Sequence, residues 1–192
     1  MAKATISTAP RLKALYATQY VKELQAELDL TNVNEVPVLE KIVVSVGTGK
    51  SKDDKRMLEA VKNTLTKVTG QAPVERLAKK SIATFKIRAG MGAPVGIYVT
   101  LRGPRMYEFL DRLVNITLPR VRDFHGVGTK FDKGGNYNLG ITDQSIFPEL
   151  TFEETQLVHG MQVTFAIKNG NKVASRALLE KFGLPFEKEG NK

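Results

Sequence analysis

The sequence predicts an α+β fold in which an antiparallel β-sheet has helices packed on one face. Apolar residues recur at helical spacing in several segments, and they alternate with polar residues in the segments between them. Two alternating segments follow one another without a helix between them, as the arms of a hairpin do, which indicates antiparallel pairing. With 192 residues, 42% of them hydrophobic, the chain is long enough to bury a substantial core.

The first helix is predicted to begin near Pro10, because proline is favoured in the first turn of a helix. The apolar residues that follow at helical spacing are Leu12, Leu15, Tyr16, Tyr20, Leu24 and Leu28. A strand is predicted from Val38 to Val46, where the side chains alternate. Its apolar face consists of Val38, Ile42, Val44 and Val46, and its polar face includes Lys41 and Ser45.

A second helix is predicted after the glycine-containing turn that follows this strand. Asp53 and Asp54 can cap its N-terminus, and Gly70 ends it. Its apolar stripe consists of Met57, Leu58, Val61, Leu65 and Val68. Such a stripe is typical of a helix that packs on a sheet.

Residues 74–88 and 95–102 are predicted to form the two arms of the hairpin. The segment that joins them, 89–94, is rich in Gly and Pro and is expected to be a long mobile turn. In the second arm one face carries Val95, Ile97, Val99 and Leu101, and the other carries Gly96, Tyr98, Thr100 and Arg102. The second face is therefore polar, aromatic and basic.

The remaining predicted elements are a helix from Pro104 to about Thr117, a glycine-rich loop over 119–136, strands Tyr137–Ile141 and Met161–Ile167, and a last helix over 172–182. The sequence shows no repeat and no linker between domains. We therefore expect a single α+β domain over residues 10–187, with flexible ends at 1–9 and 188–192.

Most of the positive charge lies in one stretch of the chain. Residues 76–130 contain eleven Lys and Arg side chains against three Asp and Glu, which gives +8 of the formal +9 of the whole chain. The rest of the chain is close to neutral. A local excess of this kind predicts a docking surface for a polyanionic partner.

Composition argues against several other functions. The chain has no cysteine, and its two histidines, His125 and His159, are far apart and have no acidic cluster around them, so we expect no metal site and no cofactor. His159 is expected at the surface, and Glu153 and Glu154 are expected to be solvated rather than catalytic. No apolar run is long enough to span a membrane, and no small-molecule substrate is expected. An anionic membrane could attract the same cations, but no exposed apolar helix face lies beside them, so we expect no membrane partner and keep a basic membrane adaptor only as a second alternative. The first 22 residues lack acids, as in an organelle transit peptide, but we favour a short loose terminus before the first helix.

The segment Val46–Ser51 leaves a strand, contains Gly-Lys-Ser and enters a helix, as a phosphate-binding P-loop does. The spacing is wrong, because the first glycine of the motif would fall at Val44, inside the strand. Too little loop then remains to surround a phosphate. Nucleotide binding is kept as the alternative function, and a tight strand-to-helix turn is the preferred interpretation.

Cations, hydroxyls and an aromatic ring gather on the polar face of the predicted sheet. The first hairpin arm contributes Lys79, Lys80, Ser81, Thr84, Lys86 and Arg88, the second contributes Tyr98, Thr100 and Arg102, and Lys41 and Ser45 lie beside them. In RNA recognition, cations bind phosphates, hydroxyls bind phosphate oxygens and 2′-OH groups, and rings stack on unpaired bases. The sequence therefore predicts an RNA-binding face.

Eight motifs occur in order along the chain: Lys79–Ser81, Phe85–Arg88, Val99–Gly103, Arg105–Phe109, Leu118–Gly126, Gly135–Ile141, Gln144–Glu149 and Ala177–Leu179. With them the chain resembles the bacterial-type ribosomal large-subunit protein five family, whose members bind 5S ribosomal RNA. The resemblance spans about residues 10–187. It implies a structural protein, not an enzyme, in the central protuberance of the large subunit of cytoplasmic ribosomes, where it helps to attach 5S rRNA to the large rRNA.

The resemblance also assigns residues by position. The rRNA-binding residues would be Lys41, Ser45, Gln71, Lys79, Lys80, Ser81, Lys86, Thr100 and Arg102, to which the polar face adds Tyr98. A loop containing Arg88, Gly90, Met91, Gly92, Ala93 and Pro94 would approach the P-site tRNA. A loop containing Arg120, Arg122, Asp123, Phe124, His125 and Lys130 would face a small-subunit head protein across an intersubunit bridge.

This sequence departs from the family pattern at three places. Ser45 stands where the family usually has Asn, so a shorter hydroxyl replaces an amide. His125 stands where Arg is common, which leaves a weaker cation. The segment 90–94 is about two residues longer than usual.

Overall fold

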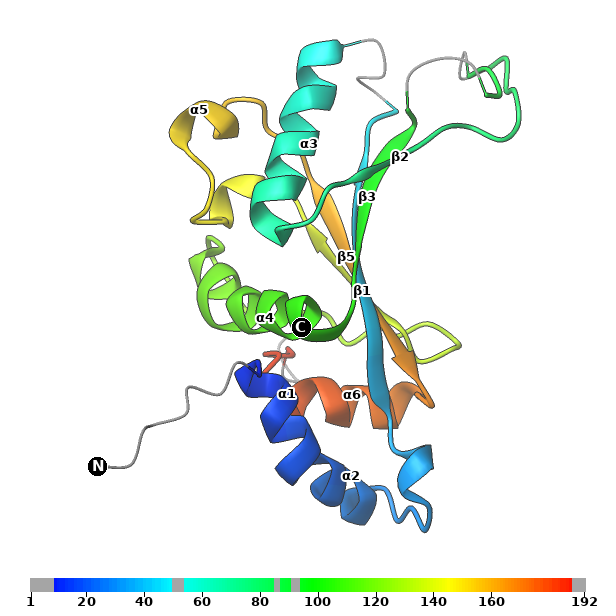
Figure 1. Cartoon of the computed structure of the whole chain (residues 1–192), viewed down its shortest axis with the longest axis vertical. Coiled ribbons are helices and arrows are strands. Elements are labelled where there is room, and N and C mark those ends of the chain that lie inside the picture. Colours follow the sequence, from blue (N-terminus) through cyan, green and yellow to red (C-terminus); the bar gives the residue numbers. More distant parts are fainter. Residues whose placement is uncertain (1–8, 50–53, 85–86, 91–93, 188–192) are drawn as a thin grey trace. The chain divides into compact units, whose positions relative to one another are not determined.

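The structure is a computed structural model that describes residues 9–49, 54–84, 87–90 and 94–187 (Figure 1). Its strands are β1 Val38–Gly47, β2 Val74–Arg76, β3 Gly96–Leu101, β4 Tyr137–Ile141 and β5 Met161–Lys168. Its α-helices are α1 Arg11–Leu15, α2 Val21–Glu27, α3 Lys55–Thr69, α4 Gly103–Arg112, α5 Phe152–Thr155 and α6 Lys172–Lys181. The strands form one sheet in the order β2-β3-β1-β5-β4, which confirms the predicted α+β class.

The chain forms two compact units. Unit 1 comprises residues 1–41, 102–137 and 166–192, and unit 2 comprises residues 42–101 and 138–165. Strands β1, β4 and β5 each contribute residues to both units.

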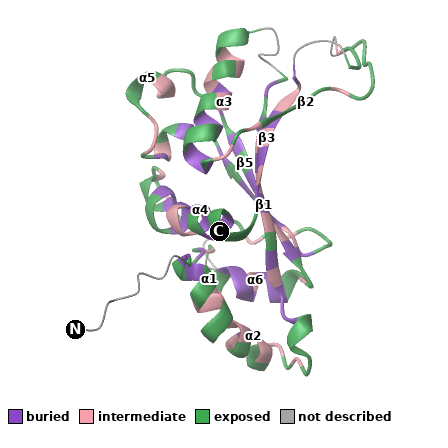
Figure 2. Ribbon diagram, in the orientation of Figure 1, coloured by how far each residue is buried: buried purple, intermediate pink, exposed green. Residues whose placement is uncertain are grey.

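In unit 2 the pairing of β1 with β3 separates an apolar face from a polar one. The two strands are antiparallel, with Ile42 opposite Leu101 and Val44 opposite Val99. These residues and their neighbours Val46 and Ile97 are at most 2% exposed, and the residues between them are half-buried or exposed. Figure 2 shows this alternation along both strands. The predicted period-2 pattern is therefore confirmed from Ile42 to Val46 in β1 and from Ile97 to Leu101 in β3.

Helix α3 covers the apolar face of unit 2, where it packs against β3. Its buried residues include Val61, Leu65 and Val68, which belong to the predicted stripe. The side chain of Asp54 caps the helix by accepting from the backbone N–H groups of Arg56 and Met57, at 3.0 and 3.3 Å. Gly70 ends it in the left-handed conformation, with φ of 67°. Asp53, the other predicted cap, lies outside the described residues.

The hairpin after α3 differs from the prediction. Residues Val74–Arg76 pair with β3 as a strand, and the chain then leaves the sheet as an irregular hairpin (Figure 1, upper right). Single backbone hydrogen bonds join Arg76 to Val95 and Ala78 to Gly90, and two join Ile82 and Ile87. The two arms therefore pair as far as Ile82 and Ile87, and the described residues of the predicted turn, Ala89, Gly90 and Pro94, belong to the second arm.

The physical reason is that both ends of the predicted turn have other partners. Thr48, just after β1, binds Val95 through its backbone N–H at 3.0 Å and donates its hydroxyl to the carbonyl of Pro94 at 2.5 Å. Ala89, at the other end, donates its N–H to the hydroxyl of Ser81 at 2.9 Å. These contacts hold both ends within the hairpin although the composition of the segment favours a turn.

In unit 1 an aromatic cluster surrounds Phe182, which is 3% exposed. The ring centroids of Tyr16, Tyr20 and Tyr107 lie 6.0, 5.9 and 6.0 Å from that of Phe182. Tyr16 also donates its hydroxyl to the carbonyl of Pro37, and burial raises its pKa to about 12. The predicted first helix is present as α1, a π-helical turn over Tyr16–Tyr20, and α2.

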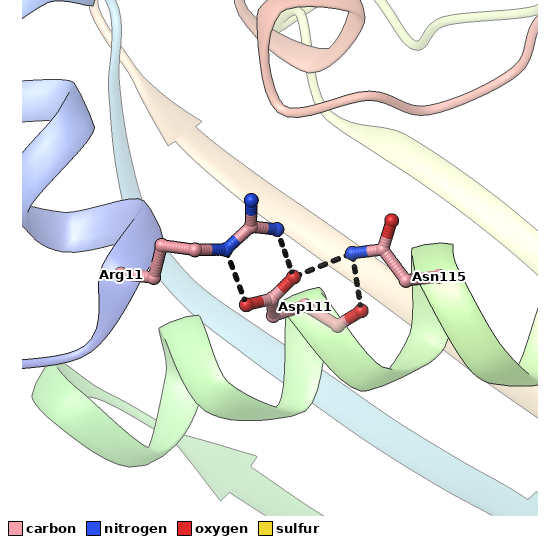
Figure 3. Close-up of polar contacts among 3 residues, drawn as sticks. All are labelled: Arg11, Asp111 and Asn115. Atoms are coloured by element: carbon pink, nitrogen blue, oxygen red, sulfur yellow. Dashed lines mark hydrogen bonds and ion pairs between the residues drawn. The ribbon is translucent and has the colours of Figure 1, made fainter.

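Helix α1 packs on α4 within unit 1, and a polar contact joins them (Figure 3). The guanidinium of Arg11 binds both carboxylate oxygens of Asp111, at 2.6 and 3.2 Å. Asn115 donates to the same carboxylate and to the backbone carbonyl of Asp111. The hydrogen bond and charge of Arg11 lower the pKa of Asp111.

One further prediction needs correction, and one element was not predicted. The sequence pattern puts Val38 on the apolar face of β1, but the buried residue at this end is Leu39, because the alternation of β1 shifts by one residue between Leu39 and Ile42. The last helix, predicted over about 172–182, is confirmed: it ends at Lys181, with Phe182 as its C-cap. The sequence also did not predict the short helix α5, which a capping box formed by Thr151 and Glu154 begins.

Candidate nucleic-acid interface

The polar face of unit 2 is built by the register of its strands. Ser45 lies opposite Tyr98 in the β1–β3 pair, and Val74 lies opposite Tyr98 in the β2–β3 pair, so these three side chains form one row. Thr100 lies two residues along the same face of β3 and is half-buried, as are Ser45 and Tyr98. The structure therefore brings together the predicted residues Ser45, Tyr98 and Thr100. We call this surface the open face.

Arg76 belongs to the open face although the sequence pattern did not single it out. It lies two residues after Val74 and opposite Gly96, so it shares a face with Tyr98. Its guanidinium carbon lies 4.5 Å from the centroid of the Tyr98 ring, a cation–π contact. The register of β2 with β3 shows that Arg76 lies beside Tyr98, and the composition of the basic stretch does not. The alternation of β2 would have found Arg76 only once its pairing with β3 was known.

Lys79, Lys80 and Ser81 do not lie on the sheet, contrary to the extended arm that the sequence predicted. They belong to the irregular hairpin beyond β2, and all three are exposed. The hydroxyl of Ser81 accepts from the N–H of Ala89, so this residue also holds the hairpin together. Lys86 lies outside the described residues.

Gln71 is half-buried in the turn between α3 and β2. Its backbone N–H donates to the hydroxyl of Thr69 at 3.3 Å, which fixes the chain just after the end of the helix. The residue stands three positions before Val74 along the chain.

Lys41 and Arg102 belong to unit 1. Arg102 forms an ion pair with Glu40 at 3.1 Å, and both side chains remain about half exposed. The hydrogen bond from Arg102, together with the charge of Lys41, lowers the pKa of Glu40, so this carboxylate is ionised near neutral pH. Arg102 thus has an internal anionic partner, which the sequence did not indicate.

The loop expected to approach tRNA is described in part. Arg88 and Gly90 are exposed, Gly90 has φ of 66°, and Pro94 is buried. Met91, Gly92 and Ala93 lie outside the described residues.

The loop expected at an intersubunit bridge is held by hydrogen bonds at Val127 and Gly128, and most of its predicted contact residues are exposed. Val127 pairs with the C-terminal segment through hydrogen bonds to Pro185 and Glu187, and Tyr137 donates its hydroxyl to the carbonyl of Gly128 at 2.7 Å. The predicted contact residues that are exposed are Arg120, Arg122, Asp123, His125 and Lys130, and Phe124 is half-buried.

The alternative P-loop site has little support in unit 2. A P-loop binds phosphate with the N–H groups of the first helical turn. Here Asp54 occupies two of those donors, on Arg56 and Met57, and places a carboxylate where a phosphate would sit. Lys50 and Ser51 lie outside the described residues.

Two of the residues considered for catalysis or metal binding, His159 and Glu154, have structural roles. His159, expected at the surface, is only 6% exposed, because its backbone N–H donates to the buried side chain of Gln144 at 2.8 Å. Burial lowers the pKa of His159. Glu154 pairs with Lys67 at 2.6 Å. Across the described ranges, no group of three or more acidic or His side chains could hold a metal ion. Nor, within the same ranges, is any helix both long enough and apolar enough to cross a membrane.

Two family descriptions match the chain. Residues 32–88 match the family described as Ribosomal protein L5, and residues 94–186 match the description of the C-terminus of the same ribosomal family. Residues 89–93 lie between the two matches.

Curated relatives match over nearly their whole length. The large ribosomal subunit protein uL5 of Flavobacterium johnsoniae is 48% identical over 180 residues, which cover 93% of this chain and 97% of the relative. The uL5 proteins of Dichelobacter nodosus and of a Synechococcus strain are 48% and 49% identical over 177 residues, which cover 92% of this chain and 98% and 97% of those relatives.

Proposed function

We propose that this chain, which belongs to the ribosomal protein uL5 family and is a structural protein of the large ribosomal subunit, binds 5S rRNA through the open face of unit 2. Membership of this family also places the chain in the ribosome, in the cytoplasm. Its work is that of a scaffold: it holds RNA and carries out no reaction.

One observation carries the RNA-binding proposal. The sheet of unit 2 has one face covered by α3, and its other face presents a hydroxyl, an aromatic ring and a guanidinium close to one another: Ser45 opposite Tyr98, and Arg76 over the Tyr98 ring. A folded domain gains little stability from such a surface in water, whereas RNA offers each group a partner. The same strand pairing that buries Ile42, Val44 and Leu101 produces this surface.

Cations beyond the strands would extend the contact to phosphates. Lys79 and Lys80 are exposed on the hairpin, and neither forms an ion pair with another described residue. Gln71, Ser81 and Lys86 in unit 2 complete the proposed set. From unit 1, Lys41 and Arg102 are proposed to bind rRNA as well.

The test is a filter-binding titration of 5S rRNA with the variant Lys80→Ala/Arg102→Ala. Charge-assisted contacts contribute about 1.5–3 kcal/mol each, so we expect at least about tenfold weaker binding. The control is Lys62→Ala/Lys67→Ala, which removes the same charge from α3, where these lysines pair with Glu75 and Glu154. Equal affinities of the first variant and the wild type would refute the assignment of these residues.

Three further contacts are part of the proposal. The chain is proposed to help attach 5S rRNA to the large rRNA, to approach P-site tRNA with residues 88–94, and to face a small-subunit head protein with residues 120–130. The exposed cations Arg88, Arg120 and Arg122 support these assignments. Cross-linking in purified 70S ribosomes from residue 88 and from residue 122 would identify the partner of each loop. A cross-link from residue 88 to protein alone would argue against the tRNA contact.

A further inference from the structure

The hairpin beyond β2 forms a groove beside the open face. The groove has a volume of about 570 Å³ and lies entirely within unit 2. Its apolar lining includes Leu77, Ile82, Ile87 and Val95, from both arms of the hairpin. Hydrogen bonds between the arms, Ile82 with Ile87 and Arg76 with Val95, hold these residues in place.

The apolar lining is unusually accessible for a stable hairpin. Leu77 is 47% exposed and Ile82 is 44% exposed, although both are large aliphatic residues. Clustered apolar exposure beside polar groups is typical of a binding groove. This groove is therefore suited to a flat apolar group of modest size.

The rim of the groove is cationic and determines which apolar group fits. Arg76, Lys79 and Lys80 line it, and none of its described lining residues is Asp or Glu. The nearest acidic residue along the chain, Glu75, alternates to the opposite face of β2, where it pairs with Lys62 of α3. The rim thus keeps three positive charges beside an apolar floor.

Arg76 connects the groove to the open face. Its guanidinium stacks over the Tyr98 ring, and Gly96, directly opposite it in the strand pair, places no side chain at the junction. A stacked guanidinium loses little further freedom when it binds a phosphate or a base, because its plane is already fixed. The junction is therefore ordered before any ligand binds.

We propose that this groove binds one unpaired nucleobase of RNA, with the phosphates on either side of that nucleotide held by Arg76, Lys79 and Lys80. The inference rests on the proposed function and specifies which part of the RNA binds in the groove. A base offers an apolar face to Leu77 and Ile82, and its phosphates complement the charge of the rim. An apolar protein segment would cover the floor but would leave the three cations without partners.

The first experiment measures 5S rRNA binding by the full-length variants Leu77→Ser and Ile82→Ser. Each variant removes aliphatic surface that the base would cover, so each is expected to bind about fivefold more weakly or worse. The slope of affinity against salt is expected to stay unchanged, because no charge is removed. Val158→Ser is the matched control, since Val158 is 61% exposed and lies in unit 2 away from the groove; its binding should stay within about twofold of the wild type.

The second experiment does not depend on 5S rRNA. The wild type should bind hexauridylate at least about fivefold more tightly than the same hexamer with its two central bases removed, and Leu77→Ser should lose that preference. If the wild type binds 5S rRNA but Leu77→Ser and Ile82→Ser bind it equally well and no hexamer preference exists, the groove proposal is overturned. If the hexamer preference exists but 5S rRNA does not bind, the groove proposal stands and the 5S assignment fails. Weaker capture of a ribosomal protein by Leu77→Ser, with unchanged RNA binding, would also overturn the proposal in favour of a protein occupant.

Discussion

The two lysines of the hairpin allow a quantitative test of how RNA is held. Lys79 and Lys80 are exposed and have no ion pair with another described residue, so each can neutralise one phosphate at no internal cost. Each phosphate neutralised releases counterions and adds about 0.7–0.9 to the slope of log affinity against log salt. Removing both lysines should therefore reduce the slope by about 1.4–1.8.

The size of this effect can be stated for an ordinary titration. Between about 50 and 200 mM monovalent salt, a slope difference of about 1.4–1.8 corresponds to a factor of about 7–12. The ratio of the 5S rRNA affinity of the wild type to that of Lys79→Ala/Lys80→Ala should fall by about that factor as the salt concentration rises across these values. Fluorescence anisotropy with end-labelled 5S rRNA at several salt concentrations measures both slopes.

The control for this titration is Lys62→Ala/Lys67→Ala. It removes two lysines from α3 that already pair with Glu75 and Glu154, so its slope should match that of the wild type within about 0.3. Parallel lines for the wild type and the Lys79→Ala/Lys80→Ala variant would refute the reasoning. They would mean that the hairpin lysines do not neutralise phosphates, whatever the absolute affinities.

Three predictions concern stability and can be measured by urea denaturation. Asp54→Ala should lower the free energy of unfolding by about 1 kcal/mol, because α3 loses its N-cap; no loss would show that the cap is dispensable. Asp111→Asn should cost up to about 1 kcal/mol near neutral pH, because the contact with Arg11 lowers the folded-state pKa of Asp111. This cost should disappear as pH falls below 3.8 through the lowered folded pKa, and a cost that persists in acid would argue against the ion pair. Burial lowers the pKa of His159 from 6.5, so the native state resists its protonation and stability should fall as pH drops below 6.5. His159→Gln should remove this part of the pH dependence, whereas the exposed His125→Gln should keep it; equal profiles for the two variants would contradict the assignment.

The parts of the fold that the sequence predicted well depend on local patterns. Alternation alone places Ile97, Val99 and Leu101 on the apolar face of β3, and the stripe and terminal residues of α3 define that helix from Asp54 to Gly70. These features need no knowledge of distant partners, because burial on one face and capping depend on residues close in sequence.

The parts that could not be predicted depend on contacts between distant segments. Pro94 and its neighbours have the composition of a turn, but Thr48, 46 residues earlier in the chain, donates its hydroxyl to the Pro94 carbonyl and holds Pro94 in the hairpin arm. His159 has the neighbours of a surface residue, but Gln144 holds it in the interior. In the candidate site, Arg76 became visible only through its register with Gly96, which decides that it shares a face with Tyr98. Local composition carries none of this information.

The ion pair of Arg102 leads to a last prediction, in which removing an acid strengthens RNA binding. Glu40 is ionised near neutral pH, because Arg102 and Lys41 lower its pKa. A carboxylate at this position competes with phosphate for Arg102 and repels it. Exposed ion pairs contribute about 0.2–1 kcal/mol, so Glu40→Gln should tighten 5S rRNA binding by up to about fivefold at low salt, and by less as salt rises.

The matched control for this prediction is Glu75→Gln. Glu75 also pairs with a cation, Lys62. Its side chain lies on the other face of the sheet from Tyr98, so its removal should leave RNA affinity nearly unchanged. Parallel titrations of 5S rRNA with both variants measure the difference. Weaker binding by Glu40→Gln would mean that Glu40 orients Arg102 toward the RNA, and unchanged binding would mean that Arg102 makes no phosphate contact. Weaker binding would therefore refute the competition between Glu40 and phosphate, and unchanged binding would contradict the rRNA contact proposed for Arg102.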